Sequence, residues 1–101
     1  MRNPEQTIGN MADKLKTAFI ASVDENGYPN VKAMLQPRKR EGIKVFYFTT
    51  NMSSIRVSQY LRNDKACVYF CDSRFFRGVM LRGTMEVLTD PESKGMIWQE
   101  G

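Results

Sequence analysis

The first stretch of the chain places its hydrophobic residues at helical spacing. Ile8, Met11 and Leu15 recur every three or four positions, which predicts an amphipathic helix over Pro4–Lys16. Asn3 is a suitable N-cap, and proline suits the first helical position because its missing N–H would have no partner there. The chain is therefore predicted to open with a helix.

Short runs of β-branched and aromatic residues follow and predict five strands. These strands are expected over Thr17–Val23, Pro29–Gln36, Ile43–Thr49, Lys65–Asp72 and Phe75–Leu88. Asn26-Gly27 is a hairpin signal between the first two strands, and Pro37–Gly42 has the composition of a charged turn. Successive strands joined by short turns are expected to pair in antiparallel fashion.

Two further helices are predicted between and after the strands. Ile55–Arg62 places Val57, Tyr60 and Leu61 on one face, and a last helix is expected to begin at Asp90-Pro91-Glu92. The last predicted strand is interrupted by Gly78 and Gly83, which is typical of a bulge or a barrel corner. The fold class predicted from this order is mostly β, a small antiparallel barrel with flanking short helices.

Length and composition narrow the class of protein. A chain of 101 residues, 42% hydrophobic, is the size of one domain, so residues 1–101 are expected to form a single unit. Such a small unit often builds a site for a large ligand at a subunit interface, which favours a dimer. No long apolar run and no signal-peptide core are found in the sequence, so we expect a cytoplasmic protein with no membrane partner.

Charge and residue usage restrict the chemistry. The net charge of +4 favours anionic ligands, among them phosphates, nucleotides and nucleic acid. The sequence has no histidine, which removes histidine-based triads and the commonest metal ligand, so redox chemistry would come from a cofactor. Cys67 and Cys71 would stand roughly 13 Å apart on one strand, too far for a disulfide, and are interpreted as buried apolar residues.

The segment from Thr49 to Arg56 is the most informative candidate site. A strand ends, hydroxyl side chains cluster at Thr49, Thr50, Ser53 and Ser54, a helix begins, and Arg56 lies in its first turn. Helix N-termini expose unpaired N–H groups that bind phosphate, and a guanidinium adds a charged donor. The alternative is that Ser53 or Ser54 is only a helix cap and Arg56 points to water.

Weaker candidates lie elsewhere. Lys32 stands among apolar residues, and alternation places Lys32 and Met34 on the strand face opposite Val31 and Ala33, although most strand lysines are simply solvated. Aromatic residues that could stack on a planar ring, or else form the core, are Tyr47, Phe48, Tyr69, Phe70, Phe75, Phe76 and Trp98. A nucleic-acid surface would use Arg38, Lys39, Arg40 and Lys44, but these charges are few and scattered.

Four segments together resemble the pyridoxamine 5′-phosphate oxidase-like flavoproteins, the FMN-binding split-barrel group, and in particular its general-stress-protein branch. They are Ile20–Pro29 (IASVDENGYP), Val31–Met34 (VKAM), Val45–Val57 (VFYFTTNMSSIRV) and Gly83–Val87 (GTMEV) before Asp90. The resemblance covers about Thr17 to Asp90, and it rests on the order and spacing of the segments rather than on any single motif.

This resemblance implies a six-stranded split barrel, a homodimer, and FMN held between the subunits. The flavin and ribityl chain would lie along Lys32, Ala33 and Met34, with lysine where the family usually has arginine. The phosphate would be held by Thr49, Thr50, Ser53, Ser54 and Arg56, and the isoalloxazine would approach Tyr69 or Phe70. Relatives usually continue through a further strand beyond the position of Gly101. Either the sequence is truncated at its C-terminus relative to them, or its ordered part ends early, or its barrel is completed differently.

The function implied by the resemblance is that of an FMN-binding oxidoreductase, stress-related, with an unknown small-molecule substrate. Pyridoxamine-phosphate oxidation itself is not expected, because the chain is short and has no evident pyridoxal-phosphate site. Two alternatives remain: a deazaflavin in the same fold, or a small basic barrel that binds nucleic acid. Ordinary haem ligation is disfavoured by the missing histidine.

Overall fold

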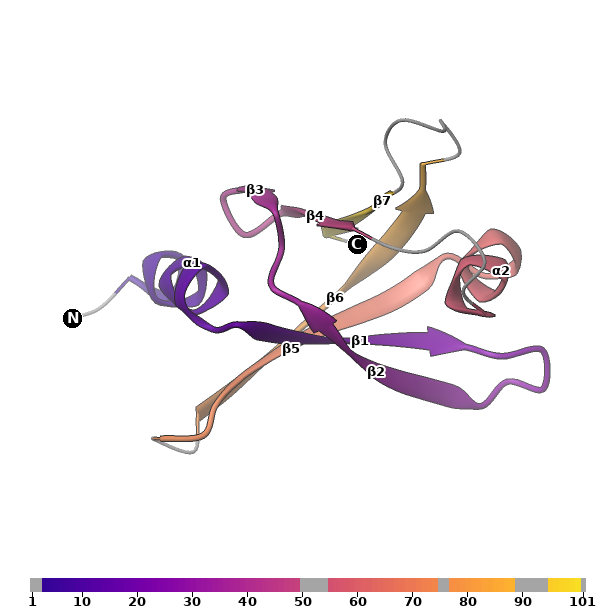
Figure 1. Ribbon diagram of the computed structural model, residues 1–101, viewed down its shortest axis with the longest axis horizontal. Helices are drawn as coiled ribbons and strands as arrows, with labels where there is room; N and C mark the ends of the chain where they lie inside the picture. The colour runs from indigo at the N-terminus through magenta and orange to yellow at the C-terminus, as the bar shows by residue number, and fades with distance from the viewer. Residues whose placement is uncertain (1–2, 50–54, 75–76, 89–94, 101) are drawn as a thin grey trace.

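The computed structural model of the chain describes residues 3–49, 55–74, 77–88 and 95–100, and only the backbone of residues 55 and 56 (Figure 1). Its elements are α1 (Pro4–Lys14), β1 (Thr17–Val23), β2 (Pro29–Leu35), β3 (Lys39–Glu41), β4 (Val45–Thr49), α2 (Ile55–Arg62), β5 (Lys65–Asp72), β6 (Arg77–Val87) and β7 (Gly95–Glu100). Helix α1 has the predicted cap, since the Asn3 side chain accepts a hydrogen bond from the backbone N–H of Glu5 at 2.9 Å. The fold is mostly β, as predicted.

All described strands belong to one antiparallel sheet in the order β2-β1-β5-β6-β7-β4-β3. The ladder does not close between the described strands, so β2 and β3 form its two edges. The two helices lie at opposite ends of the long axis, α1 at the left and α2 at the right of Figure 1. Each helix can therefore define a separate surface of the molecule.

The sheet bends strongly across its middle. Strands β5 and β4 are three positions apart in the order, which would separate them by roughly 14 Å in a flat sheet. The ring of Phe70 on β5 nevertheless lies 5.5 Å from the ring of Phe46 on β4, centroid to centroid. The bend makes one face of the sheet concave, and we call this the inner face and the opposite one the outer face.

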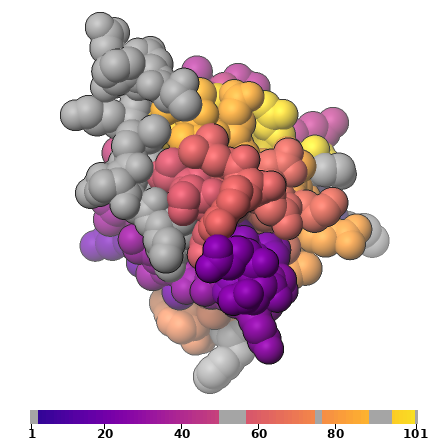
Figure 2. Space-filling model, turned by 90° about the vertical axis from the view of Figure 1, so that its right-hand side faces the viewer, coloured from indigo at the N-terminus to yellow at the C-terminus, as the bar shows by residue number. Residues whose placement is uncertain are grey.

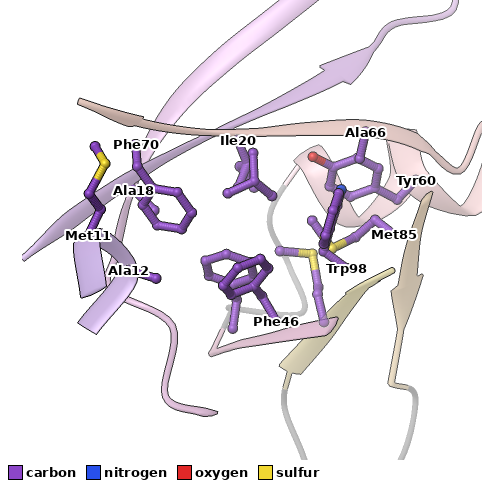
Figure 3. Packing of buried hydrophobic residues seen from close by; sticks show 13 residues of the cluster. Met11, Ala12, Ala18, Ile20, Phe46, Tyr60, Ala66, Phe70, Met85 and Trp98 are labelled. Atoms are coloured by element: carbon purple, nitrogen blue, oxygen red, sulfur yellow. The ribbon is translucent and has the colours of Figure 1, made fainter. Parts of the chain in front are cut away.

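The hydrophobic core fills the inner face (Figure 3). Its largest fully buried side chains include Trp98, Phe46, Phe48, Phe70 and Ile20. Helix α1 adds Met11 and Ala12 at one end, and α2 adds Tyr60 at the other. Alternate residues of β1 and β5 are buried, as a half-buried strand requires.

The charged segment predicted to be a turn contains a strand, so that prediction was wrong. Lys39–Glu41 form β3, which pairs with β4. Arg40 extends from this strand to α1 and donates two hydrogen bonds to the carboxylate of Asp13, at 2.9 and 2.8 Å. These bonds hold the pKa of Asp13 below its usual value. Pairing with the neighbouring strand β4 and the contact of Arg40 with the distant helix α1 hold these three charged residues extended.

The predicted last helix is also corrected. Its expected start at Asp90-Pro91-Glu92 lies outside the described residues, but Gly95–Glu100 form strand β7 between β6 and β4. Trp98 in this strand is 1% exposed and packs against Phe46, with ring centroids 5.5 Å apart. Pairing on both sides and burial of the indole outweigh the helical capping signal upstream.

Neither glycine interrupts the fifth predicted strand, since β6 runs without a break over Arg77–Val87. A Cβ at Gly83 would lie 1.9 Å from the carbonyl oxygen of Gln99 and 2.7 Å from the indole of Trp98. A Cβ at Gly78 would lie 1.9 Å from the hydroxyl of Tyr69. The two glycines make room for neighbours rather than turning corners.

Smaller differences concern burial. Leu61, predicted to share the buried face of α2, is 64% exposed, and Gln59 is buried in its place. Cys67 and Cys71 lie on β5 as unpaired thiols, as predicted, but they are half-buried on the outer face.

Candidate functional site

Helix α2, which carries Arg56, lies beside the β1–β2 end of the sheet (Figure 2), and hydrogen bonds join it to β1. The Tyr60 hydroxyl donates a hydrogen bond of 2.7 Å to the carbonyl oxygen of Ala21. The buried hydroxyl of Ser22 donates to the side-chain oxygen of Gln59. Arg62 at the last turn forms an ion pair of 3.1 Å with Glu25 in the β1–β2 turn. These contacts fix the orientation of α2 relative to β1.

The β1–β2 turn beside α2 is held by its own carboxylate. Asp24 accepts backbone hydrogen bonds from Asn26 and Tyr28, both at 2.9 Å, and Gly27 takes φ +83°. The bond from Tyr28 is the main reason that the pKa of Asp24 is lowered. This turn matches the predicted Asn-Gly hairpin signal.

The predicted phosphate segment spans the end of β4 and the start of α2. Thr49 is the exposed last residue of β4, where it pairs with Gly95. Arg56 lies in the first turn of α2, as predicted. Thr50, Ser53 and Ser54 lie outside the described residues. The order of strand, linking segment and helix required by the hypothesis is present.

The predicted flavin strand is the sheet edge β2. Its pairing with β1 places Lys32 opposite the buried Ile20 and Met34 opposite the buried Ala18, so both belong to the inner face. Ala33 lies opposite Phe19 and belongs to the outer face. The predicted alternation is confirmed. Lys32 is exposed because β2 is an edge strand, with no described strand on its other side.

Tyr69 and Phe70 lie on opposite faces of β5. Phe70 is fully buried against Phe46, whereas the Tyr69 side chain is on the outer face and 40% exposed. Tyr69 lies next to Phe19, with ring centroids 6.4 Å apart. Of these two candidates, Tyr69 is the one with an accessible ring.

The outer face carries an apolar surface across four strands. Ala33, Phe19, Tyr69 and Met80 form one cross-strand row through β2, β1, β5 and β6. Met80 is 59% exposed, and on β2 Val31 and Leu35 are 66% and 83% exposed. We call Val31, Leu35, Tyr69, Met80 and the row between them the outer apolar surface.

Gly78 is a site residue that the sequence reading missed. The Tyr69 hydroxyl lies over the Cα of Gly78, where any side chain would displace it. The sequence signal for it is the glycine itself within a strongly β-prone run, which indicates a bulge or a barrel corner rather than a contact with Tyr69. Gly78 therefore sets where the accessible ring of the outer apolar surface lies.

The candidate residues do not converge on one spot of a single chain. Ala33 and Tyr69 share the outer face, Lys32 and Met34 lie on the inner face of the edge strand, and Thr49 and Arg56 lie at the β4–α2 end. Within the described ranges there is no group of three or more cysteine or acidic residues placed to hold a metal ion. Among the candidates with described side chains, Lys32 supplies an exposed positive charge and Tyr69 an accessible aromatic ring.

An open, mostly β antiparallel sheet with two short helices defines the class, and its structural neighbours are split-barrel proteins. The sequence model described as pyridoxamine 5′-phosphate oxidase matches residues 5–101. The chain belongs to the pyridoxamine 5′-phosphate oxidase family.

Individual relatives agree with this assignment. A pyridoxine/pyridoxamine 5′-phosphate oxidase of Agrobacterium fabrum is 38% identical over 74 residues, 73% of this chain and 35% of that protein. The corresponding protein of Chelativorans sp. is 37% identical over 93 residues, 92% of this chain and 42% of that protein. The chain thus spans only about a third to two-fifths of the length of these relatives.

A solved structure is similar over a greater share of its length. It is a Clostridium acetobutylicum protein described as related to general stress protein 26 of B. subtilis, in the pyridoxinephosphate oxidase family. Its TM-score is 0.83 at 28% identity, covering 95% of this chain and 82% of that one. Neither helix in the part of the chain described here is long and apolar enough to cross a membrane.

Proposed function

We propose that two copies of this chain bind flavin mononucleotide between them and that the flavin serves a cytoplasmic, stress-related redox reaction. The observation that carries the proposal is the membership in the pyridoxamine 5′-phosphate oxidase family over nearly the whole chain. The neighbour related to general stress protein 26 supports the stress-related branch. The unpaired thiols of Cys67 and Cys71 agree with a reducing compartment.

The split of the candidate residues between two faces supports a site between subunits. One flat ring cannot lie against Lys32 and Met34 on the inner face and against Tyr69 on the outer face of the same sheet. It can lie against the edge strand of one copy and the outer face of another. A site between two copies therefore uses Lys32 and Met34 together with Tyr69, whereas a site within one copy can use only one of these two groups.

The outer apolar surface supports the same arrangement. Large apolar side chains that remain exposed together on a small domain usually mark an interaction site. A second copy would cover Val31, Leu35 and Met80, which this chain leaves 66%, 83% and 59% exposed.

The residues present fit the chemistry of a flavin nucleotide. Because Gly78 has no side chain, the Tyr69 ring can lie on the outer face, where a planar ligand can stack on it. Arg56 in the first turn of α2 can pair with a phosphate. The flavin would supply hydride and electron transfer. The chain would bind the phosphate, orient the ring and exclude water from it.

The phosphate role of Arg56 is tested with two ligands that differ only in that group. Arg56→Ala should weaken FMN binding by about 1.5–3 kcal/mol, because a charged hydrogen bond is lost, and should leave riboflavin binding nearly unchanged. Quenching of flavin fluorescence on titration with protein gives both affinities.

Arg62→Ala is the matched control, because Arg62 lies at the other end of the same helix and pairs with Glu25. This variant should bind FMN as the parent chain does. Equal loss of FMN and riboflavin in Arg56→Ala would assign Arg56 a structural role and remove the phosphate hypothesis.

The subunit arrangement is tested by charging the edge strand. Val31→Lys with Leu35→Lys should convert a dimer into monomers in sedimentation equilibrium and abolish FMN binding at the same time. Leu61→Lys is the control, since Leu61 is 64% exposed on α2, away from β2. A monomeric parent chain that binds FMN tightly would contradict the interface site.

A further inference from the structure

A groove lies at the end of the molecule opposite α2. Helix α1 and the far end of the β5–β6 hairpin both lie at the left of Figure 1, the helix above and the hairpin end below. Between them is a groove of about 910 Å³, which we call the α1 groove. Small-molecule sites typically measure about 300–1,000 Å³, so the groove has the size of a ligand site.

Four cationic side chains line the α1 groove. Lys14 and Lys16 approach it from the end of α1, and Arg74 and Arg77 from the β5–β6 hairpin. Asp72 is the single acidic residue among the described residues of the lining. Four positive charges against one negative give this described lining a net charge of +3, which favours a multiply charged anion.

The arginines are held by a buried carboxylate. The side chain of Asp72 is only 8% exposed and lies 3.3 Å from Arg74 Nε and 4.0 Å from an Arg77 nitrogen. Asp72 also accepts the backbone N–H of Arg74 at 3.2 Å. The carboxylate of Asp72 therefore brings both guanidinium groups to the same end of the groove. This arrangement is unlike a set of independent surface lysines.

The rest of the lining suits a small molecule. Gln6, Thr7 and Asn10 on α1 present amide and hydroxyl groups, and Met11 and Leu15 form an apolar wall. A concave lining that combines apolar walls with a few polar and charged groups is typical of small-molecule sites.

The α1 groove is separate from the proposed flavin site. None of the six flavin candidates whose side chains are described lines it, and α1 and α2 lie at opposite ends of the molecule in Figure 1. We infer that the α1 groove is a second binding site, for a small molecule that carries a phosphate or pyrophosphate group. The inference goes beyond the flavin proposal and does not depend on it.

The groove is tested with inorganic pyrophosphate as the ligand. Inorganic phosphate and chloride, which carry less charge, serve as comparison ligands. Calorimetric titration of the FMN-treated full chain should show pyrophosphate binding more tightly than phosphate. Amide NMR shifts should change at residues 6–16 and 72–77 and remain constant in α2. The flavin fluorescence should not change during the titration.

Lys14→Gln with Lys16→Gln should weaken pyrophosphate binding at least about tenfold, since charged hydrogen bonds are lost while Asp72 and its arginines remain. The control is Lys39→Gln with Lys44→Gln, which removes the same charge from exposed lysines outside the groove. Equal weakening in both double variants would reduce the effect to net charge and overturn the site.

Release of FMN in proportion to bound pyrophosphate would also overturn the inference, because the anion would then occupy the flavin site. If the chain binds no FMN at all, the titration and the NMR map still decide the α1 groove by themselves. The two proposals can therefore fail independently.

Discussion

The two faces of the central strands differ in what their apolar residues do. On the inner face of β1 and β5, Ile20, Val68 and Phe70 are fully buried in one core. On the outer face of the same strands, Phe19 and Tyr69 contact each other but leave the Tyr69 ring 40% exposed. Folding of one chain uses the inner set, so the outer set is available for binding.

The largest expected effect separates two neighbours on β5. Phe70→Ala should destabilise the chain by about 3–5 kcal/mol, because it opens a cavity in the core. Tyr69→Ala should cost about 1 kcal/mol, the value of one exposed aromatic pair, yet it should strongly weaken FMN binding. Urea unfolding and flavin titration of both variants measure this, and equal losses of stability would erase the distinction between the faces.

The two strand glycines sharpen the comparison at the next level. Gly83→Ala forces a methyl group against the Gln99 carbonyl and the Trp98 indole on the inner face, which should cost about 2–3 kcal/mol. Gly78→Ala meets only the tip of Tyr69 on the outer face, so the ring should move with little loss of stability. Gly83→Ala should therefore lose more thermal stability, and Gly78→Ala should lose more FMN affinity. If one variant lost more of both, the proposed placement of Tyr69 by Gly78 would be wrong.

A polar pair extends the comparison to α2. Gln59→Ala leaves the buried Ser22 hydroxyl without its partner and should cost about 1–3 kcal/mol. Leu61→Ala on the exposed side of the same helix should change stability by about 0.5 kcal/mol or less. Urea unfolding tests both, and a larger loss for Leu61→Ala would show that a further contact covers this side of α2.

The smallest expected effect concerns acid stability. The hydrogen bond from Arg74 is the main reason that the pKa of Asp72 is lowered in the folded chain. The stability contributed by this carboxylate is therefore complete above its unfolded pKa and is lost as the pH falls through the lower folded pKa. Asp72→Asn should lose less stability on acidification over this window than the parent chain, as measured by urea unfolding at a series of pH values.

Glu86→Gln, at an exposed residue of β6, is the control for the removal of one carboxylate. If the free energy of unfolding fell by the same amount on acidification in the parent chain and in Asp72→Asn, the Arg74 contact would contribute nothing to folding.

Much of the fold could be predicted from local pattern. β1, β5 and α2 begin and end at the predicted residues, because each has strong local propensity and clear flanking signals. β3 and β7 were missed because their extended form depends on β4, which neither Lys39–Glu41 nor Gly95–Glu100 encodes locally. A capping signal at Asp90 says nothing about a strand that begins at Gly95.

The candidate site was predicted less completely. The alternation that separates Lys32 from Ala33 is readable in the sequence, because a strand has a period of two. The placement of Gly78 under Tyr69 is a contact between two strands and depends on their register. The α1 groove was missed for the same reason, since Lys14 and Arg77 are brought together only by the fold.

The edge position of β2 has a consequence for the freshly folded chain. One side of this strand has no neighbour among the described strands, so its outward N–H and C=O groups are available to any extended peptide. The exposed side chains of Val31 and Leu35 favour association at that edge. The positive charge of Lys32 between them opposes edge-to-edge pairing of two identical strands. Replacing Lys32 by an apolar residue should therefore favour aggregation. The charge of Lys32 would then have two roles, keeping the chain soluble and contacting the proposed nucleotide.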